Sequence, residues 1–171
     1  MNKILPIILS IFFVLSYGAN KQIENYPNGN KKSQGMIKGL FWKYKNGEWI
    51  YYYPNGYIKE RGVYKGICSF QDGIWTFYYD NGEKWKEVNY KRGKDIGIQK
   101  EWHENGQIKE EWKLKNSIQK DGEWTSYYEN GQIKEERNYK DGKEDSKSTT
   151  YFEDGQIVQE GNVKDGKIEG K

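Results

Sequence analysis

Hydrophobic and polar residues alternate along most of this chain, and the alternating stretches recur with nearly the same sequence. One of them, "DGEWTSYYENGQIKEERNYKDG", runs from Asp121 to Gly142. Alternation with a period of two is typical of β-strands that bury one face. The stretches are interrupted by Asn-Gly or Asp-Gly pairs, which mark tight hairpin turns. The pattern therefore predicts pairs of strands joined by short turns.

The turns recur at a nearly fixed interval. Their glycines are Gly29, Gly56, Gly82, Gly106, Gly131 and Gly155. Successive intervals are 27, 26, 24, 25 and 24 residues, and a period of this size indicates a repeat protein. A second series of turns, of the kind seen at Lys140–Gly142, divides each repeat into two strands. We therefore expect an all-β fold, an antiparallel meander of stacked β-hairpin repeats, with a single repeat domain of about six hairpin units over residues 20–171.

The faces of the strands follow from the turn type. An Asn-Gly hairpin with an even loop predicts a type I′ turn, with positive φ at both residues. Tyr128 then lies opposite Ile133, and Tyr127 lies opposite Lys134. A three-residue loop would reverse this assignment. Because alternate side chains share a face, the packing face is expected to hold Trp124, Tyr128, Ile133 and Tyr139, with Trp49, Tyr51, Tyr53, Ile58, Tyr64, Trp75, Phe77, Tyr79, Ile108, Trp112 and Leu114 from the other repeats.

The other face is expected to carry a row of aromatic residues among lysines and glutamates. This candidate binding stripe consists of Tyr52, Tyr78, Trp102, Tyr127 and Tyr151. One interpretation is structural: an aromatic ladder that covers lysine stems and gains cross-strand and cation–π energy. The other is functional: an exposed stripe that stacks on a partner protein or a sugar. The sequence leaves both interpretations open.

The first residues, "MNKILPIILSIFFVLSYGAN", form a separate segment. One early lysine precedes an apolar run from Ile4 to Leu15, and small residues follow up to Ala19. This arrangement is typical of a secretory signal peptide, which we place at residues 1–19. We expect an exported protein, in the periplasm, at the cell surface or secreted, with no permanent membrane span after signal removal. An uncleaved anchoring segment is the alternative.

Composition narrows the classes of partner. The mean hydropathy is −1.10, yet 16% of the residues are aromatic, which is unlike a disordered chain. Lysine and glutamate are interleaved and the net charge is only +3, so neither nucleic acid nor an anionic membrane is expected as the chief partner. The single cysteine, Cys68, excludes an internal disulfide and a cysteine-rich metal site.

No arrangement of residues predicts catalysis. The one histidine, His103, occupies a place that tyrosine or phenylalanine holds in other repeats, so we interpret it as a substituted aromatic residue. The adjacent pair Glu110-Glu111 lies on a predicted strand, where neighbouring side chains point to opposite faces and cannot flank one bond. We therefore expect no enzyme activity, and no catalytic residue, cofactor or metal site.

The copies are imperfect. Lys84 stands where other repeats have isoleucine, and Gln99 and Ser148 replace the tryptophan. The first repeat and the stretch "GICSFQDG" carry extra residues before the tryptophan strand. In repeat proteins such irregular loops collect on one edge and often make the specific contacts.

The unit "W-x-x-Y-Y-x-N-G-x-I-K-E-E-x-x-Y-K-x-G" resembles the bacterial variant of the MORN repeat, and especially the YwqK-type antitoxin-like repeat proteins. The likeness extends from about Tyr26 to Lys171. The resemblance implies a β-meander of stacked hairpins that binds proteins and carries no catalytic residues.

Three functions remain to be compared. The first is a non-catalytic, exported repeat scaffold that binds another protein, with an antitoxin-like or immunity-like role. The second is a cell-wall or glycan-binding module that uses exposed aromatics, since "GEWIYYYPNG" also resembles choline- and glucan-binding repeats. Those repeats are usually shorter and poorer in lysine and glutamate, which favours the first. The third is a small enzyme. The identity of the partner is not predicted.

Overall fold

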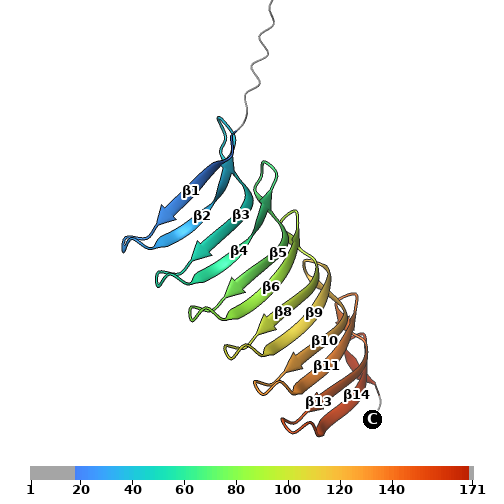
Figure 1. Ribbon diagram of the computed structural model, residues 1–171. Helices are drawn as coiled ribbons and strands as arrows, with labels where there is room; N and C mark the ends of the chain where they lie inside the picture. Colours follow the sequence, from blue (N-terminus) through green and yellow to red (C-terminus); the bar gives the residue numbers. More distant parts are fainter. Residues whose placement is uncertain (1–17, 170–171) are drawn as a thin grey trace, which may run out of the picture.

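The computed structural model describes residues 18–169 as one open antiparallel sheet whose hairpins stack in a single row (Figure 1). The strands are β1 (Asn20–Asn25), β2 (Lys31–Lys38), β3 (Tyr44–Tyr52), β4 (Ile58–Lys65), β5 (Phe70–Tyr78), β6 (Lys84–Lys91), β7 (Lys94–Asp95), β8 (Gly97–Trp102), β9 (Ile108–Asn116), β10 (Gln119–Tyr127), β11 (Ile133–Lys140), β12 (Lys143–Glu144), β13 (Ser146–Tyr151), β14 (Ile157–Lys164) and β15 (Lys167–Glu169). Among these residues there is no helix, and hence none that could cross a membrane. The predicted all-β meander is confirmed. The predicted signal segment lies outside the described residues, apart from Gly18 and Ala19.

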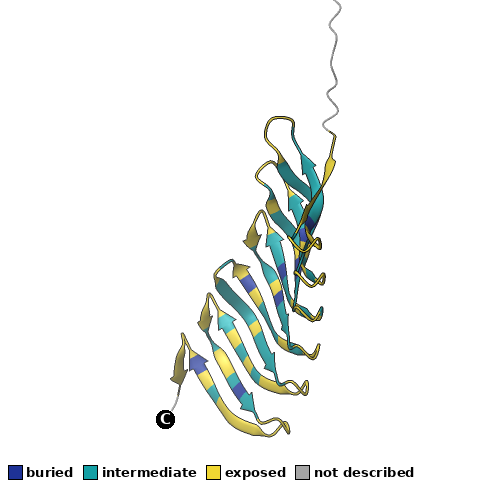
Figure 2. Cartoon of the chain, turned by 90° about the vertical axis from the view of Figure 1, so that its left-hand side faces the viewer, coloured by how far each residue is buried: buried dark blue, intermediate teal, exposed yellow. Residues whose placement is uncertain are grey.

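Six hairpins follow one another, and each is closed by one of the Asn-Gly or Asp-Gly turns. They are β1–β2, β3–β4, β5–β6, β8–β9, β10–β11 and β13–β14, numbered here hairpins 1 to 6. The connections between hairpins lie at the opposite edge, where β7 pairs with β6 and β12 pairs with β11. Figure 2 shows the consequence: exposed turns border both edges, and the buried residues lie along the middle of the strands.

The Asn-Gly turns have a different geometry from the predicted one. In hairpin 5 the Tyr128 N–H donates to the Gln132 carbonyl, and the Gly131 N–H donates to the Tyr128 carbonyl, both at 2.9 Å. Gly131 has a φ of 82°, whereas the φ of Asn130 is not positive. The loop therefore has three residues, a type I turn followed by a glycine bulge, and the type I′ prediction is wrong. Asn130 Oδ1 accepts the Gln132 N–H at 2.9 Å, which holds the loop in this form.

Type I′ geometry occurs at the other edge of the sheet. There, two successive residues have positive φ in the turns Arg92-Gly93, Asp141-Gly142 and Asp165-Gly166. The flanking lysines pair directly, as Lys140 does with Lys143, so these are two-residue loops. The type I′ geometry predicted for the Asn-Gly turns thus occurs in these three turns instead.

The three-residue loop changes which residues face each other. Next to the turn, Tyr127 pairs with Ile133 instead of Lys134. A bulge follows, and beyond it the register agrees with the prediction, so Trp124 pairs with Arg137. Ile133 therefore shares the face of Tyr127, while Tyr128 lies in the loop. The predicted packing face is correct for strand residues around the tryptophans and wrong for Tyr53, Tyr79, Tyr128, Ile58, Ile108 and Ile133.

The face that holds Trp49, Trp75 and Trp124, called the indole face below, contains the best-buried side chains. Trp75 is completely buried and lies against Gly62 of the preceding hairpin. A Cβ added to Gly62 would lie 2.3 Å from this indole, so only glycine permits the contact. Trp75 Nε1 donates to the Val63 carbonyl at 3.2 Å. Each such indole joins one hairpin to the hairpin before it, which gives a single-layer sheet its core.

Candidate functional site

The residues of the predicted stripe occupy equivalent places in five hairpins. Tyr52, Tyr78, Trp102, Tyr127 and Tyr151 are the last residues of β3, β5, β8, β10 and β13. Each is half-buried and pairs with the first residue of the following strand. Their side of the sheet, called the stripe face below, is opposite the indole face, because they lie an odd number of residues from the tryptophan position.

A line of hydrogen bonds runs along the same edge, from each hairpin to the next. The residue after each strand end lies in the Asn-Gly loop, and its side chain reaches the backbone carbonyl of the next stripe residue. The bonds join Tyr26 to Tyr52 (2.8 Å), Tyr53 to Tyr78 (2.8 Å), Tyr79 to Trp102 (2.8 Å), His103 to Tyr127 (3.0 Å) and Tyr128 to Tyr151 (2.7 Å). This series, called the tyrosine ladder, ends at Phe152, which holds the same place in hairpin 6 and has no hydroxyl.

His103 takes the place of a tyrosine in this ladder. Because a carbonyl oxygen can only accept, its bond to the Tyr127 carbonyl requires the proton to be on Nε2. His103 thus links hairpin 4 to hairpin 5 in the same way as the tyrosine hydroxyls link the other hairpins.

The asparagines of the turns add a second set of links between hairpins. Asn55 Nδ2 donates to the Asp80 carbonyl of the next loop, and Asn105 Nδ2 donates to the Glu129 carbonyl, both at 2.8 Å. Asp154, the counterpart in hairpin 6, has no amide to donate. Sequence reasoning assigned the asparagines to turn conformation alone and missed these links. The recurrence of an aromatic residue two places before each asparagine was the signal for a joint role.

Charged side chains cover the stripe aromatics. The Lys84 Nζ lies 4.6 Å from the ring centre of Trp102, and the Arg61 guanidinium lies 5.8 Å from that of Tyr78. The Tyr151 hydroxyl donates to the Glu136 carboxylate at 2.7 Å. These contacts are the ones that the structural interpretation of the stripe expects. A binding role for the stripe therefore depends on the exposed residues beside it on the same face.

The middle of the stripe face carries an exposed apolar pair. Ile74 is 62% exposed and Ile98 is 54% exposed, at equivalent places in hairpins 3 and 4. A hollow of about 260 Å³ is lined by both, together with Glu87, Asn89 and Lys100. In hairpins 2, 5 and 6 the equivalent places hold charged residues: Glu48, Glu123 and Lys147. The apolar pair therefore marks the centre of the row and is bordered by charge.

The loops with extra residues present further apolar side chains. The connection between β2 and β3 exposes Leu40, Phe41 and Trp42, and the connection between β4 and β5 exposes Ile67. Both connections lie at the edge opposite the Asn-Gly turns. The free, exposed thiol of Cys68 adjoins Ile67.

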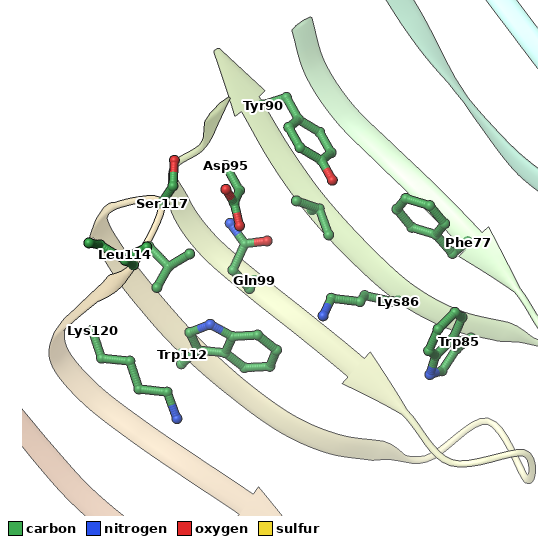
Figure 3. Close-up of a pocket in the computed structure, with 12 residues that line it drawn as sticks. Phe77, Trp85, Lys86, Tyr90, Asp95, Gln99, Trp112, Leu114, Ser117 and Lys120 are labelled. Carbon is green, nitrogen blue, oxygen red and sulfur yellow. The ribbon is translucent and has the colours of Figure 1, made fainter. Parts of the chain in front are cut away.

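On the indole face the repeat pattern changes in hairpin 4, where a hollow of about 420 Å³ opens (Figure 3). Gln99 stands where hairpins 2, 3 and 5 have tryptophan, and it is only 1% exposed. Its cross-strand partner is Trp112, so the indole has moved to the other strand of the hairpin. Phe77 and Tyr90 of the preceding hairpin line the hollow across from these two residues.

The adjacent glutamates do not converge on a common point. Glu110 accepts the Trp124 Nε1–H at 2.9 Å on the indole face, whereas Glu111 pairs with Lys100 at 2.8 Å on the stripe face. Residues 18–169 contain no group of three His, Cys, Asp or Glu side chains placed to hold a metal ion. What the arrangement offers is contact surface with hollows on both faces of the sheet.

Comparison with known families identifies the repeat. The model of the MORN repeat variant matches five segments: residues 45–65, 71–92, 96–116, 120–141 and 144–165. They correspond in order to hairpins 2 to 6. A search of curated proteins found no match. Because the five segments cover more than half of the chain and recur with the hairpins, this protein belongs to the MORN repeat variant family.

Proposed function

We propose that the protein is an exported, non-catalytic repeat scaffold that binds another protein through its stripe face. The exposed Ile74–Ile98 pair carries this proposal. Contiguous apolar surface on a monomer often marks an interaction site, and protein interfaces combine an apolar centre with a polar rim. Here Ile74 and Ile98 form the centre, and Glu87 and Lys100 belong to the rim.

The stripe extends this surface toward the Asn-Gly edge. Tyr78 lies on β5 four residues after Ile74, and Trp102 lies on β8 four residues after Ile98, so all four share one face. Tyrosine and tryptophan are the residues most often found to dominate binding at interfaces. Because the tyrosine ladder already fixes this edge, little conformational entropy remains to be lost on binding.

The test is to place in hairpins 3 and 4 the residue that hairpins 2 and 5 carry. In the double variant Ile74→Glu/Ile98→Glu, the apolar centre becomes charged while the strands keep a side chain that the same fold accepts at Glu48 and Glu123. The mature chain should capture a protein from its native envelope extract, and the double variant should capture at least about tenfold less. Glu123→Gln is the matched control. Undiminished capture by a folded double variant would refute the proposed surface.

Within this proposal, an immunity-like role is the one that the resemblance to antitoxin-like repeat proteins favours. The partner would be a toxic protein met outside the cytoplasm. Export is tested by N-terminal sequencing of protein purified from its native cell, where cleavage near Gly18 or Ala19 is expected. An intact Met1 would rule out this processing.

A glycan-binding role is the second candidate, and the regular row of Trp102 and its four tyrosines favours it, since successive sugars can stack on successive rings. Soluble peptidoglycan fragments or choline should then protect Trp102 fluorescence from a quencher, a protection absent in Trp102→Phe. In that case Tyr127→Ala should spare the fold and weaken binding by about 1 kcal/mol or more. Lower stability with unchanged binding would indicate a purely structural stripe.

A further inference from the structure

Two hairpins keep a lysine of their own among aromatic rings of the indole face. The Lys45 Nζ lies 4.7 to 5.2 Å from the ring centres of Trp49, Tyr51 and Tyr64. The Lys120 Nζ lies 5.1 to 5.7 Å from those of Trp112, Trp124 and Tyr139. Both lysines stand two residues before a glycine with positive φ, Gly47 and Gly122. They define a place at which this fold receives an ammonium group.

Hairpin 4 has an acid at that place. Asp95 stands two residues before Gly97, which also has positive φ, and its side chain lines the 420 Å³ hollow. In hairpin 6 the equivalent residue is also an acid, Glu144, but there the Arg137 guanidinium lies 3.3 Å away and supplies the cation. No lysine or arginine among residues 18–169 forms an ion pair with Asp95. Hairpin 4 thus has an unpaired acid at this position, and the aromatic rings beside it, Phe77 and Tyr90, come from hairpin 3.

Gln99 adds a second acceptor to the hollow. Its Nε2 donates to the Ile96 carbonyl at 3.0 Å, and this bond fixes the orientation of the amide, since a carbonyl can accept only from the nitrogen. The Oε1 atom therefore points the other way, into the space between Tyr90 and Trp112 (Figure 3). No donor in the described part of the chain reaches it. Because no buried side-chain oxygen or nitrogen of the described residues lacks a hydrogen-bond partner, Oε1 is open to the hollow, where a donating ligand can reach it.

The cations around the hollow are already engaged. The Lys86 Nζ is bonded to the Glu101 carboxylate at 2.8 Å. The Lys120 Nζ lies among the rings of Trp112, Trp124 and Tyr139. Figure 3 shows the Trp112 indole between Lys120 and Gln99. Burial lowers the pKa of Lys120, while burial and the Asp95 carboxylate raise the pKa of Tyr90. The unbalanced charge at the Gln99 end of the hollow is therefore negative.

We propose that the indole-face hollow binds an ammonium or guanidinium group on an apolar stem, with Asp95 and the Gln99 Oε1 as acceptors and Phe77 and Tyr90 as walls. The cation would lie beside aromatic rings, as the ammonium groups of Lys45 and Lys120 do, but here the rings belong to hairpin 3. The cation comes from a small amine or from a basic side chain of a polypeptide. The site lies on the face opposite the Ile74–Ile98 pair, so it stands independently of the protein-binding proposal.

The test titrates the full mature chain with small probes and follows the side-chain amide signal of Gln99 by NMR. N-acetyl-lysine methylamide and N-acetyl-arginine methylamide should give saturable shifts, and the norleucine analogue, which lacks the charge, should give none. Asp95→Asn should weaken binding of the lysine probe by roughly tenfold or more, as expected for loss of a charged hydrogen-bond acceptor. Glu153→Gln, an exposed loop carboxylate at the opposite edge, is the matched control and should bind normally.

A second variant places a lysine side chain of the protein itself in the site. Asp95→Lys installs the residue that hairpins 2 and 5 carry, so its ammonium should enter the hollow, abolish probe binding and leave the melting temperature equal or higher. Equal binding of the norleucine and lysine probes, unchanged binding by a folded Asp95→Lys variant, or displacement of the Gln99 signal by N-acetylglucosamine alone would overturn the proposal. Comparing n-butylamine with a lysine inside a glycine peptide then identifies the source of the cation. Tighter binding of n-butylamine indicates a small free amine, and tighter binding of the peptide indicates a basic side chain of a polypeptide.

Discussion

The tyrosine ladder should contribute measurably to stability, and its middle bond is the best place to test this. Tyr79→Phe removes one hydroxyl, whose bond to the Trp102 carbonyl is 2.8 Å long, and keeps the ring beside Trp85. A hydrogen bond in a folded protein contributes a net ~0.5–1.5 kcal/mol. The abandoned carbonyl belongs to a half-buried residue and recovers part of its hydration, so we expect a loss of about 1 kcal/mol.

The assay is urea and thermal unfolding followed by far-ultraviolet circular dichroism. For a chain of this length, about 1 kcal/mol corresponds to a fall of roughly 2–4 °C in melting temperature. Tyr79 joins hairpin 3 to hairpin 4, and repeat stability is approximately a sum of units and nearest-neighbour interfaces. Weakening this interface should therefore also broaden the transition, because the two halves of the row become less strongly coupled.

Two controls separate the bond from the chemistry of the substitution. Tyr57→Phe makes the same change at a residue that is 54% exposed and whose hydroxyl has no partner in the described chain. Phe152→Tyr makes the reverse change where no carbonyl of a further hairpin follows within residues 18–169. Both should melt like the unaltered protein. If Tyr79→Phe also melts at that temperature, the ladder is a geometric consequence of stacking and contributes no net stability.

Three other substitutions have definite expected outcomes. Gly62→Ala places a Cβ 2.3 Å from the buried Trp75 ring and should cost about 1–3 kcal/mol of unfolding free energy by overpacking, whereas Gly161→Ala, at the equivalent place in hairpin 6 with nothing within 4 Å, should not destabilise. Gly131→Val forces a β-branched residue to a φ of 82° and should lower stability by about 1–3 kcal/mol; an unchanged melting temperature would contradict the strain argument. Burial raises the pKa of Glu60, so the folded state favours its protonated form and stability is lost as pH rises through that pKa. Glu60→Gln should remove this loss, giving a more stable protein at neutral pH and little change below the ordinary carboxyl pKa of 4.5, as measured by urea unfolding at both pH values.

The strands and their repeat could be predicted because alternation and turn spacing are local properties of the sequence. The faces could not be fully predicted, because Asn-Gly is compatible with loops of two or three residues. The choice depends on the backbone conformation of Asn130, which its Oδ1 bond to the Gln132 N–H stabilises. One residue of loop length then moved Ile133 to the stripe face.

Only part of the hollow of hairpin 4 could be predicted from the sequence. Gln99 could be recognised as a replacement for tryptophan, but the effect of that replacement depends on residues that only the strand register brings near it. Trp112 lies across the hairpin from Gln99, and Asp95 comes from the short strand before β8. Without the register, neither residue could be assigned to the same site.

Comparing the positions that recur in most hairpins with those that vary indicates which residues give binding specificity. Residues that recur in most hairpins, such as Tyr79, Asn105 and Trp75, have their polar atoms engaged in bonds between neighbouring hairpins. A partner therefore gains few new hydrogen bonds from them, and their contribution to recognition is the rigidity of the row. Positions that differ from hairpin to hairpin are not required for these bonds, because the neighbouring repeats fold with other residues there. Ile98 on one face and Asp95 on the other are positions of this kind, and both belong to the middle of the row, where a ligand can contact hairpins on either side.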